Sequence, residues 1–149
     1  MAELSQSIQI IPPAQLKVVS KPWGSETWLA YGEGMPYALK VIRLKAGTKT
    51  SLQYHQHKRE TNFVYAGRIR FHFQKDPDGP VEQVELEAGT CIQVPPGRIH
   101  RVEALEDVIL VESSTNHLDD VVRLSDDYKR PDGRISSEHG APAPAGEKK

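Results

Sequence analysis

The chain has 149 residues, of which 38% are hydrophobic and 26% charged, and its formal net charge is −1. This length predicts one domain with its own core. The near-neutral charge, without a basic stripe, argues against nucleic acid as a partner. No apolar run approaches the ~20 residues that span a bilayer, and the start "MAELSQSIQI" lacks the features of a signal peptide. We therefore expect a cytoplasmic protein that does not bind membranes.

The first segment, residues 1–19, contains the apolar run "SIQIIPPAQLKVV" and precedes the regular strand pattern. We interpret it as an N-terminal strand or arm. Such a segment could form a contact between two copies of the chain, or it could cover an edge strand of its own domain.

Residues 20–130 are predicted to form the folded domain. Glycine and proline interrupt this region at short intervals, and the runs between them have the length of strands. This pattern is typical of an all-β sandwich or barrel. Strands are expected at "SETWLAY", "YALKVIRL", "TSLQYHQ", "TNFVYA", "RIRFHFQ", "VEQVEL", "TCIQV", "HRVEAL" and "DVILVES".

The single cysteine, Cys91, excludes an internal disulfide, and its neighbours in "CIQVP" predict a small buried hydrophobic residue. Near the C-terminus, "LDDVVRLSDDYKR" could hold a short helix that begins near "HLDD", since acidic residues suit a first helical turn. Residues 131–149 are rich in Pro, Gly, Ser and charge, so a flexible tail is expected there.

Four side chains in "SLQYHQHKRE" could bind a metal: Gln53, His55, His57 and Glu60. Alternate residues of a strand share a face, so the first three could point the same way. Glu60 has the other parity and must be brought in by a turn or bulge. The sequence alone therefore leaves two sets open, one with Gln53 and one with His57.

The glycines around these residues resemble the two motifs of the cupin superfamily. Gly47 is followed after five residues by Gln53, then by His55, Glu60 and Gly67; in the second motif, "GTCIQVPPGRIH" ends at His100. The resemblance implies a single-domain cupin, a jelly-roll barrel. It also implies that Gln53, His55, Glu60 and His100 bind one divalent metal ion. The rival set is His55, His57, Glu60 and His100.

Four segments further resemble the C-terminal domain of type II mannose-6-phosphate isomerases: "KPWG", "SLQYHQHKRETN", "PPGRIHR" and "DDVVRLSDDYKR". The chain departs from that family after the second histidine, where Lys58 replaces an arginine and Thr61 and Asn62 replace His-Trp. The resemblance implies a homodimer and a metal-dependent sugar-phosphate isomerase. A donor set of two imidazoles, an amide and a carboxylate suits zinc first, and Fe, Mn, Co or Ni as alternatives.

If the chain is an isomerase, the base that moves the proton is expected to be His57 or Glu112. Three cations, Lys40, Lys58 and Arg101, could anchor a phosphate at the mouth of the barrel. Arg101 follows His100 directly and should point away from it. Two other functions remain open: a non-catalytic cupin that binds a sugar or nucleotide sugar, and a cupin dioxygenase or other metalloenzyme.

Overall fold

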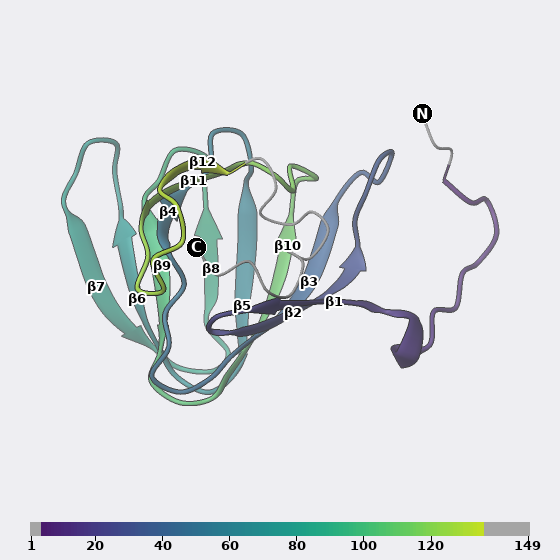
Figure 1. The fold of residues 1–149 in the computed structure, drawn as a ribbon, viewed down its shortest axis with the longest axis horizontal. Coiled ribbons are helices and arrows are strands. Elements are labelled where there is room, and N and C mark those ends of the chain that lie inside the picture. The colour runs from purple at the N-terminus through teal and green to yellow at the C-terminus, as the bar shows by residue number, and fades with distance from the viewer. Residues whose placement is uncertain (1–3, 136–149) are drawn as a thin grey trace.

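The computed structural model describes residues 4–135, which form two six-stranded antiparallel sheets that face each other as a barrel (Figure 1). Sheet A has the strand order β1-β2-β3-β10-β5-β8, and sheet B has the order β12-β11-β4-β9-β6-β7. The strands of sheet A are β1 (Lys17–Lys21), β2 (Gly24–Ala30), β3 (Ala38–Leu44), β5 (Glu60–Ala66), β8 (Cys91–Val94) and β10 (Val108–Ser114). Those of sheet B are β4 (Leu52–Tyr54), β6 (Ile69–Gln74), β7 (Val81–Leu86), β9 (His100–Ala104), β11 (Val121–Ser125) and β12 (Gly133–Ile135).

The strands form where the sequence alternates apolar and polar residues. In β3, the side chains of Ala38, Lys40, Ile42 and Leu44 are buried inside the barrel while their neighbours are more exposed. The predicted hairpin over "RIRFHFQ" and "VEQVEL" is confirmed, since β6 and β7 pair from Ile69 opposite Leu86 to Gln74 opposite Val81. The all-β prediction is confirmed as well.

The core fills one end of the barrel, between the two sheets. Sheet A contributes most of its side chains and sheet B covers them with residues of β6 and β9. The buried cluster consists of Trp23, Ile42, Leu44, Val64, Ile69, Phe71, Ile92, Val94, Val102, Ala104, Val108 and Leu110.

Two sequence predictions are wrong. The segment predicted as a short helix near "HLDD" instead makes a turn and then strand β11, which pairs with β4 and β12. Its β-branched Val121 and Val122 suit a strand. Cys91 is exposed rather than buried, because it begins the edge strand β8 and has the outward parity, whereas Ile92 and Val94 face inward.

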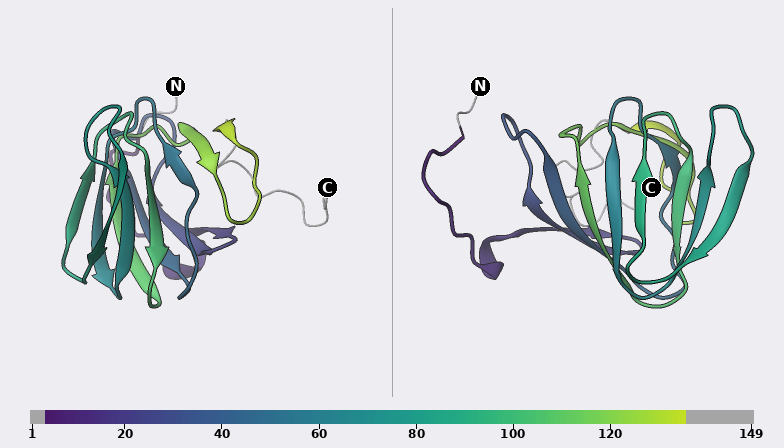
Figure 2. Two further views of the ribbon diagram at one scale, coloured as in Figure 1. Left: turned by 90° about the vertical axis from the view of Figure 1, so that its left-hand side faces the viewer. Right: turned by 180° about the vertical axis from the view of Figure 1, so that it is seen from behind.

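The two ends of the described chain differ. Residues 4–16 form an arm that contains a short 3-10 helix, η1 (Pro13–Gln15), and leads into β1 (Figure 2). The predicted tail over residues 131–149 contains β12, and its residues 136–149 lie outside the described part.

Among residues 4–135 there is no helix of the length and apolarity that crossing a membrane requires.

The glycines of both motifs hold backbone conformations that other residues rarely adopt. Gly47, Gly67, Gly89 and Gly97 have φ values of 83°, 85°, 93° and 81°. At Gly67, between β5 and β6, a Cβ atom would collide with the carbonyl oxygen of Asp107. The turns that start and end the motifs therefore require glycine.

Candidate metal centre

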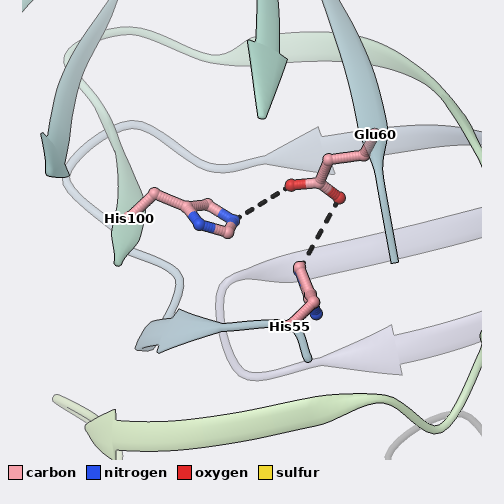
Figure 3. Close-up of side chains that lie close together, drawn as sticks. All are labelled: His55, Glu60 and His100. Atoms are coloured by element: carbon pink, nitrogen blue, oxygen red, sulfur yellow. Dashed lines mark ion pairs between the residues drawn. The ribbon is translucent and has the colours of Figure 1, made fainter. Parts of the chain in front are cut away.

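Three buried side chains meet inside the barrel, next to the apolar core. His55 follows β4, Glu60 begins β5 and His100 begins β9. Their donor atoms all lie within 4.8 Å of one another. His100 Nε2 is 2.9 Å from Glu60 Oε1, and His55 Nε2 is 3.8 Å from Glu60 Oε2 (Figure 3). The cluster thus joins residues from both sheets.

A sharp turn after β4 brings Glu60 to the inside of the barrel, although a straight strand would point it to the opposite face from Gln53 and His55. The carboxylate of Asp120 accepts hydrogen bonds from the backbone N–H groups of Gln56, His57 and Lys58, at 3.0, 2.6 and 2.8 Å. These bonds outweigh the effect of burial and lower the pKa of Asp120. The second motif is tied to the same turn, because the N–H of Gly97 donates to the carbonyl of His55 at 2.7 Å.

The hydrogen bonds of the two histidines prepare them to bind a cation. His55 Nδ1 donates to the carbonyl of Asp120 at 2.6 Å, and His100 Nδ1 donates to the carbonyl of Arg98 at 2.9 Å. Each Nε2 is then directed at the cluster, which is how carbonyl partners orient metal-binding histidines. Within the described residues, the buried His55 Nε2 has no hydrogen-bond partner.

These observations fit a divalent ion. Two donors that are each ~2.1 Å from one ion can be at most ~4.2 Å apart, and both distances to Glu60 fall inside that limit. Burial lowers the pKa of His55 to about 4, and its attraction to Glu60 only partly opposes this. His55 is therefore neutral at physiological pH, as a ligand must be.

Gln53 lies in the wall of the same cavity. It is directly opposite His100 in the pairing of β4 and β9, and its Oε1 accepts a hydrogen bond from Ser51 Oγ at 2.6 Å. The amide is thereby fixed in the cavity wall. The predicted set of Gln53, His55, Glu60 and His100 thus lines one cavity, while His57 of the rival set is exposed and its ring lies 6.0 Å from that of His117.

A buried ion-pair network adjoins the cluster. Lys58 Nζ lies 3.2 Å from Glu60 Oε2 and 3.3 Å from Glu112 Oε2, and all three side chains are buried. Burial would lower the pKa of Lys58, but the two carboxylates outweigh it and raise that pKa. Burial raises the pKa of Glu60, yet Lys58 and His100 bring it well below the ordinary value. Burial raises the pKa of Glu112 to about 7.

The three predicted phosphate anchors do not lie together at the mouth of the barrel. Lys58 is inside, as described, and Lys40 is buried over the ring of Trp28, with its Nζ 3.8 Å from Glu26. Arg101 lies on the outer face of sheet B, where it binds the carbonyl of Thr50 and the carboxylate of Asp127. As expected, it points away from His100.

Several residues of the site were not predicted from the sequence. Asp120 and Arg130 belong to "DDVVRLSDDYKR". The match of that segment to the isomerase family is the one feature of the sequence that could have pointed to them. Arg130 lines the cavity and its guanidinium binds Asp126 at 2.9 and 3.1 Å. Glu26 also lines the cavity, and its parity with Trp28 in "SETWLAY" would have placed it inside.

The family described as mannose-6-phosphate isomerase C-terminal matches residues 13–126. No curated protein matches the chain.

Solved structures of similar fold include the following two proteins. The capsular polysaccharide assembling protein CapF from Staphylococcus aureus superposes with a TM-score of 0.64 at 18% identity, over 77% of this chain and 37% of CapF. Oxalate decarboxylase from Bacillus subtilis gives a TM-score of 0.66 at 19% identity, over 74% of this chain and 30% of the enzyme. Another structure of that decarboxylase concerns its Mn(II) centres. The chain thus spans about a third of each relative and shares with them a jelly-roll cupin domain.

Proposed function

The chain belongs to the mannose-6-phosphate isomerase C-terminal family, and from this premise we propose that it is a metal-dependent sugar-phosphate isomerase. The reaction would interconvert a phosphorylated aldose and ketose, of the mannose 6-phosphate and fructose 6-phosphate type, through an enediol. The observation that carries the proposal is the buried cluster of His55, Glu60 and His100 beside Glu112 in one cavity.

Gln53, His55, Glu60 and His100 would hold the ion. A bound divalent ion would polarise the sugar oxygens at C1 and C2 and stabilise negative charge that develops there. Zinc suits these donors first, and manganese, iron, cobalt and nickel are alternatives.

Glu112 is the better placed of the two predicted bases. It lines the cavity, whereas His57 is exposed on the surface. The pKa of Glu112 is raised to about 7, so both its carboxylate form and its acid form are populated near neutral pH. It can therefore take a proton from C2 of the aldose and return it to C1, while a hydroxyl proton passes from O2 to O1. Lys58, 3.3 Å away, fixes the position of its carboxylate.

Arg130 is proposed to bind the phosphate, in place of the three predicted cations. Lys40 and Lys58 are fully buried with their carboxylate partners and Arg101 is outside. Arg130 also pairs with a carboxylate, that of Asp126, but it lines the cavity and its side chain is 19% exposed. Its guanidinium holds Asp126 through Nε and Nη2, and a phosphate would share the N–H groups of the same side chain. Arg130→Ala should raise KM for the sugar phosphate more than it lowers kcat.

The test is a coupled isomerase assay on protein loaded with each divalent ion in turn. Glu112→Gln should lower turnover by about 10²–10⁴-fold without lowering the metal content. The matched control is Glu82→Gln, which changes an exposed glutamate on β7. Equal turnover in the Glu112→Gln variant and the wild type would remove Glu112 from the reaction.

A second function is favoured by one contact. Lys58 already neutralises one oxygen of Glu60 at 3.2 Å, which would suit a cupin that binds a sugar phosphate without converting it. Calorimetric binding of mannose 6-phosphate, together with no turnover under any metal, would select this alternative over the isomerase.

A further inference from the structure

The barrel is open along one side, where each sheet ends in an edge strand. Strand β8 is the last strand of sheet A and β7 is the last strand of sheet B, and within residues 4–135 no backbone pairing joins the two (Figure 1). A cleft of about 340 Å³, lined by residues of both strands, lies between these edges. We call it the edge cleft. Its volume falls in the range of ~300–1,000 Å³ that is usual for small-molecule sites.

The walls of the edge cleft are apolar and come from both sheets. In the pairing of β6 and β7, Val84 lies opposite Phe71, so its side chain takes the inward face of sheet B. Ile92 and Val94 of β8 line the cleft from sheet A. Val84 is nevertheless 39% exposed, and Leu86 is only partly buried against the core. Because β8 has four residues and β7 has six, sheet A leaves apolar side chains of β7 uncovered.

The edge cleft is lined by two cations and by no acidic side chain of the described residues. Arg98 lines it from the loop between β8 and β9, and Lys75 from the turn after β6. Within residues 4–135, neither cation takes part in an ion pair, and the buried Nε of Arg98 has no hydrogen-bond partner. A buried N–H group without an acceptor costs free energy. The cleft therefore presents positive charge that its own walls do not neutralise.

We propose that the edge cleft binds an organic carboxylate with an apolar body. The carboxylate would accept hydrogen bonds from the guanidinium of Arg98 and pair with the ammonium of Lys75. The apolar body would lie between β7 and β8, against Val84 and Ile92. An anion with an apolar body thus complements both the charge and the walls of the cleft.

The edge cleft is a different space from the metal cavity, although the two share one wall. Phe71, Ile92 and His100 border both spaces. His55 and Glu60 border only the metal cavity. A carboxylate in the edge cleft should therefore bind without a metal ion, and the proposal does not depend on the isomerase activity.

The test compares octanoate with octanamide, which has the same apolar chain without the charge. In calorimetric titrations of the full chain, wild type should bind octanoate about 10–100-fold more tightly than octanamide, with zinc or with a chelator present. The variant Arg98→Gln with Lys75→Gln should lose this preference while its affinity for octanamide is unchanged. The variant keeps the carbonyl of residue 98, which accepts the hydrogen bond of His100 Nδ1.

Val84→Glu tests the wall of the edge cleft independently of the cations. It places a carboxylate in the cleft from a partly exposed position, so the fold should persist and the affinity for octanoate should fall by about 10-fold or more. The matched control is Val81→Glu on the same strand, because Val81 is 46% exposed and does not line the cleft. The control should bind octanoate as wild type does.

Four results would overturn the proposal. These are no binding of octanoate by wild type, an equal affinity for octanamide, a preference that survives in the Arg98 and Lys75 double variant, and binding that survives Val84→Glu. A requirement for zinc would also overturn it, since octanoate would then be a ligand of the metal. Sedimentation should be unchanged by octanoate; conversion of a dimer to monomers would mean that a second copy of the chain occupies the cleft instead.

Discussion

The two ends of the barrel interior differ in chemistry although the same strands build both. One inward row of sheet A is polar: Lys40, Glu112 and Asn62, which face one another across β3, β10 and β5. The next inward row, two residues further along each strand, is apolar: Ile42, Leu110 and Val64. On sheet B, β9 changes in the same way from His100 to Val102.

This contrast separates stability from function along each strand. The apolar end gains free energy from burial alone. The polar end keeps several charges out of water, where each must be paired to be tolerated. We therefore expect substitutions at the apolar end to change folding without changing metal binding, whereas a substitution that leaves a charge unpaired at the polar end should change folding as well as the site.

The largest effect is expected when one charge of the polar end is removed. Lys58→Met leaves Glu60 and Glu112 without their shared buried cation, which should lower the free energy of unfolding by about 3–5 kcal/mol. Urea unfolding at neutral pH, in the presence of a chelator, measures the loss. Added zinc should restore part of it, because the ion supplies positive charge beside Glu60.

The double variant Lys58→Met with Glu112→Leu is the control for that experiment. It removes both partners of one pair and should lose less stability than Lys58→Met alone. If the double variant is less stable than Lys58→Met alone, the stability loss in Lys58→Met does not come from leaving Glu112 without its partner.

At the apolar end, Ile69→Ala should lower the free energy of unfolding by about 2–5 kcal/mol, because Ile69 is fully buried and the substitution leaves a cavity. Zinc affinity, measured by competition with a chelating dye, should be unchanged. Val81→Ala at an exposed site should change stability by less than about 0.5 kcal/mol. A large loss of zinc affinity in Ile69→Ala would show that the two ends are not separable.

Much of the fold could be predicted because alternation of polar and apolar residues reports directly on strands. The prediction failed where local sequence conflicts with long-range pairing. "LDDVVRLSDDYKR" carries acidic residues that suit a helix start, but β4 offers it an open edge, and pairing with that edge makes it β11. Cys91 was misplaced because apolar neighbours do not show which side of an edge strand a residue takes.

The site was predicted in part. The resemblance to the cupin motifs implied the set of Gln53, His55, Glu60 and His100, and these residues line one cavity. Spacing could not show that Lys58 would turn inward and His57 outward, since that depends on Asp120, which is more than sixty residues away in the chain. Contacts of this kind follow from the fold and not from local pattern.

Asp120 is a buried charge at the polar end that shapes the site indirectly, because its carboxylate holds the turn that precedes Glu60. Asp120→Asn should lower the free energy of unfolding by about 1.5–3 kcal/mol at neutral pH. The pKa of Asp120 is below its ordinary value of 3.8 in the fold, so its contribution is complete above that pH and declines as pH falls below it. Unfolding of both proteins at neutral pH and below that value should show the difference shrinking; a constant difference would contradict the assignment.

The smallest effect is expected at Gln53, the weakest donor of the polar end. Gln53→Ala removes one neutral amide from the cavity wall while His55, Glu60 and His100 remain, so zinc affinity should fall by only about 10–100-fold. Titration against a chelating dye measures this, and Gln83→Ala, at an exposed site on β7, is the matched control. An unchanged affinity in Gln53→Ala would reduce the metal set to the three clustered residues and would leave the amide as a contact for the sugar.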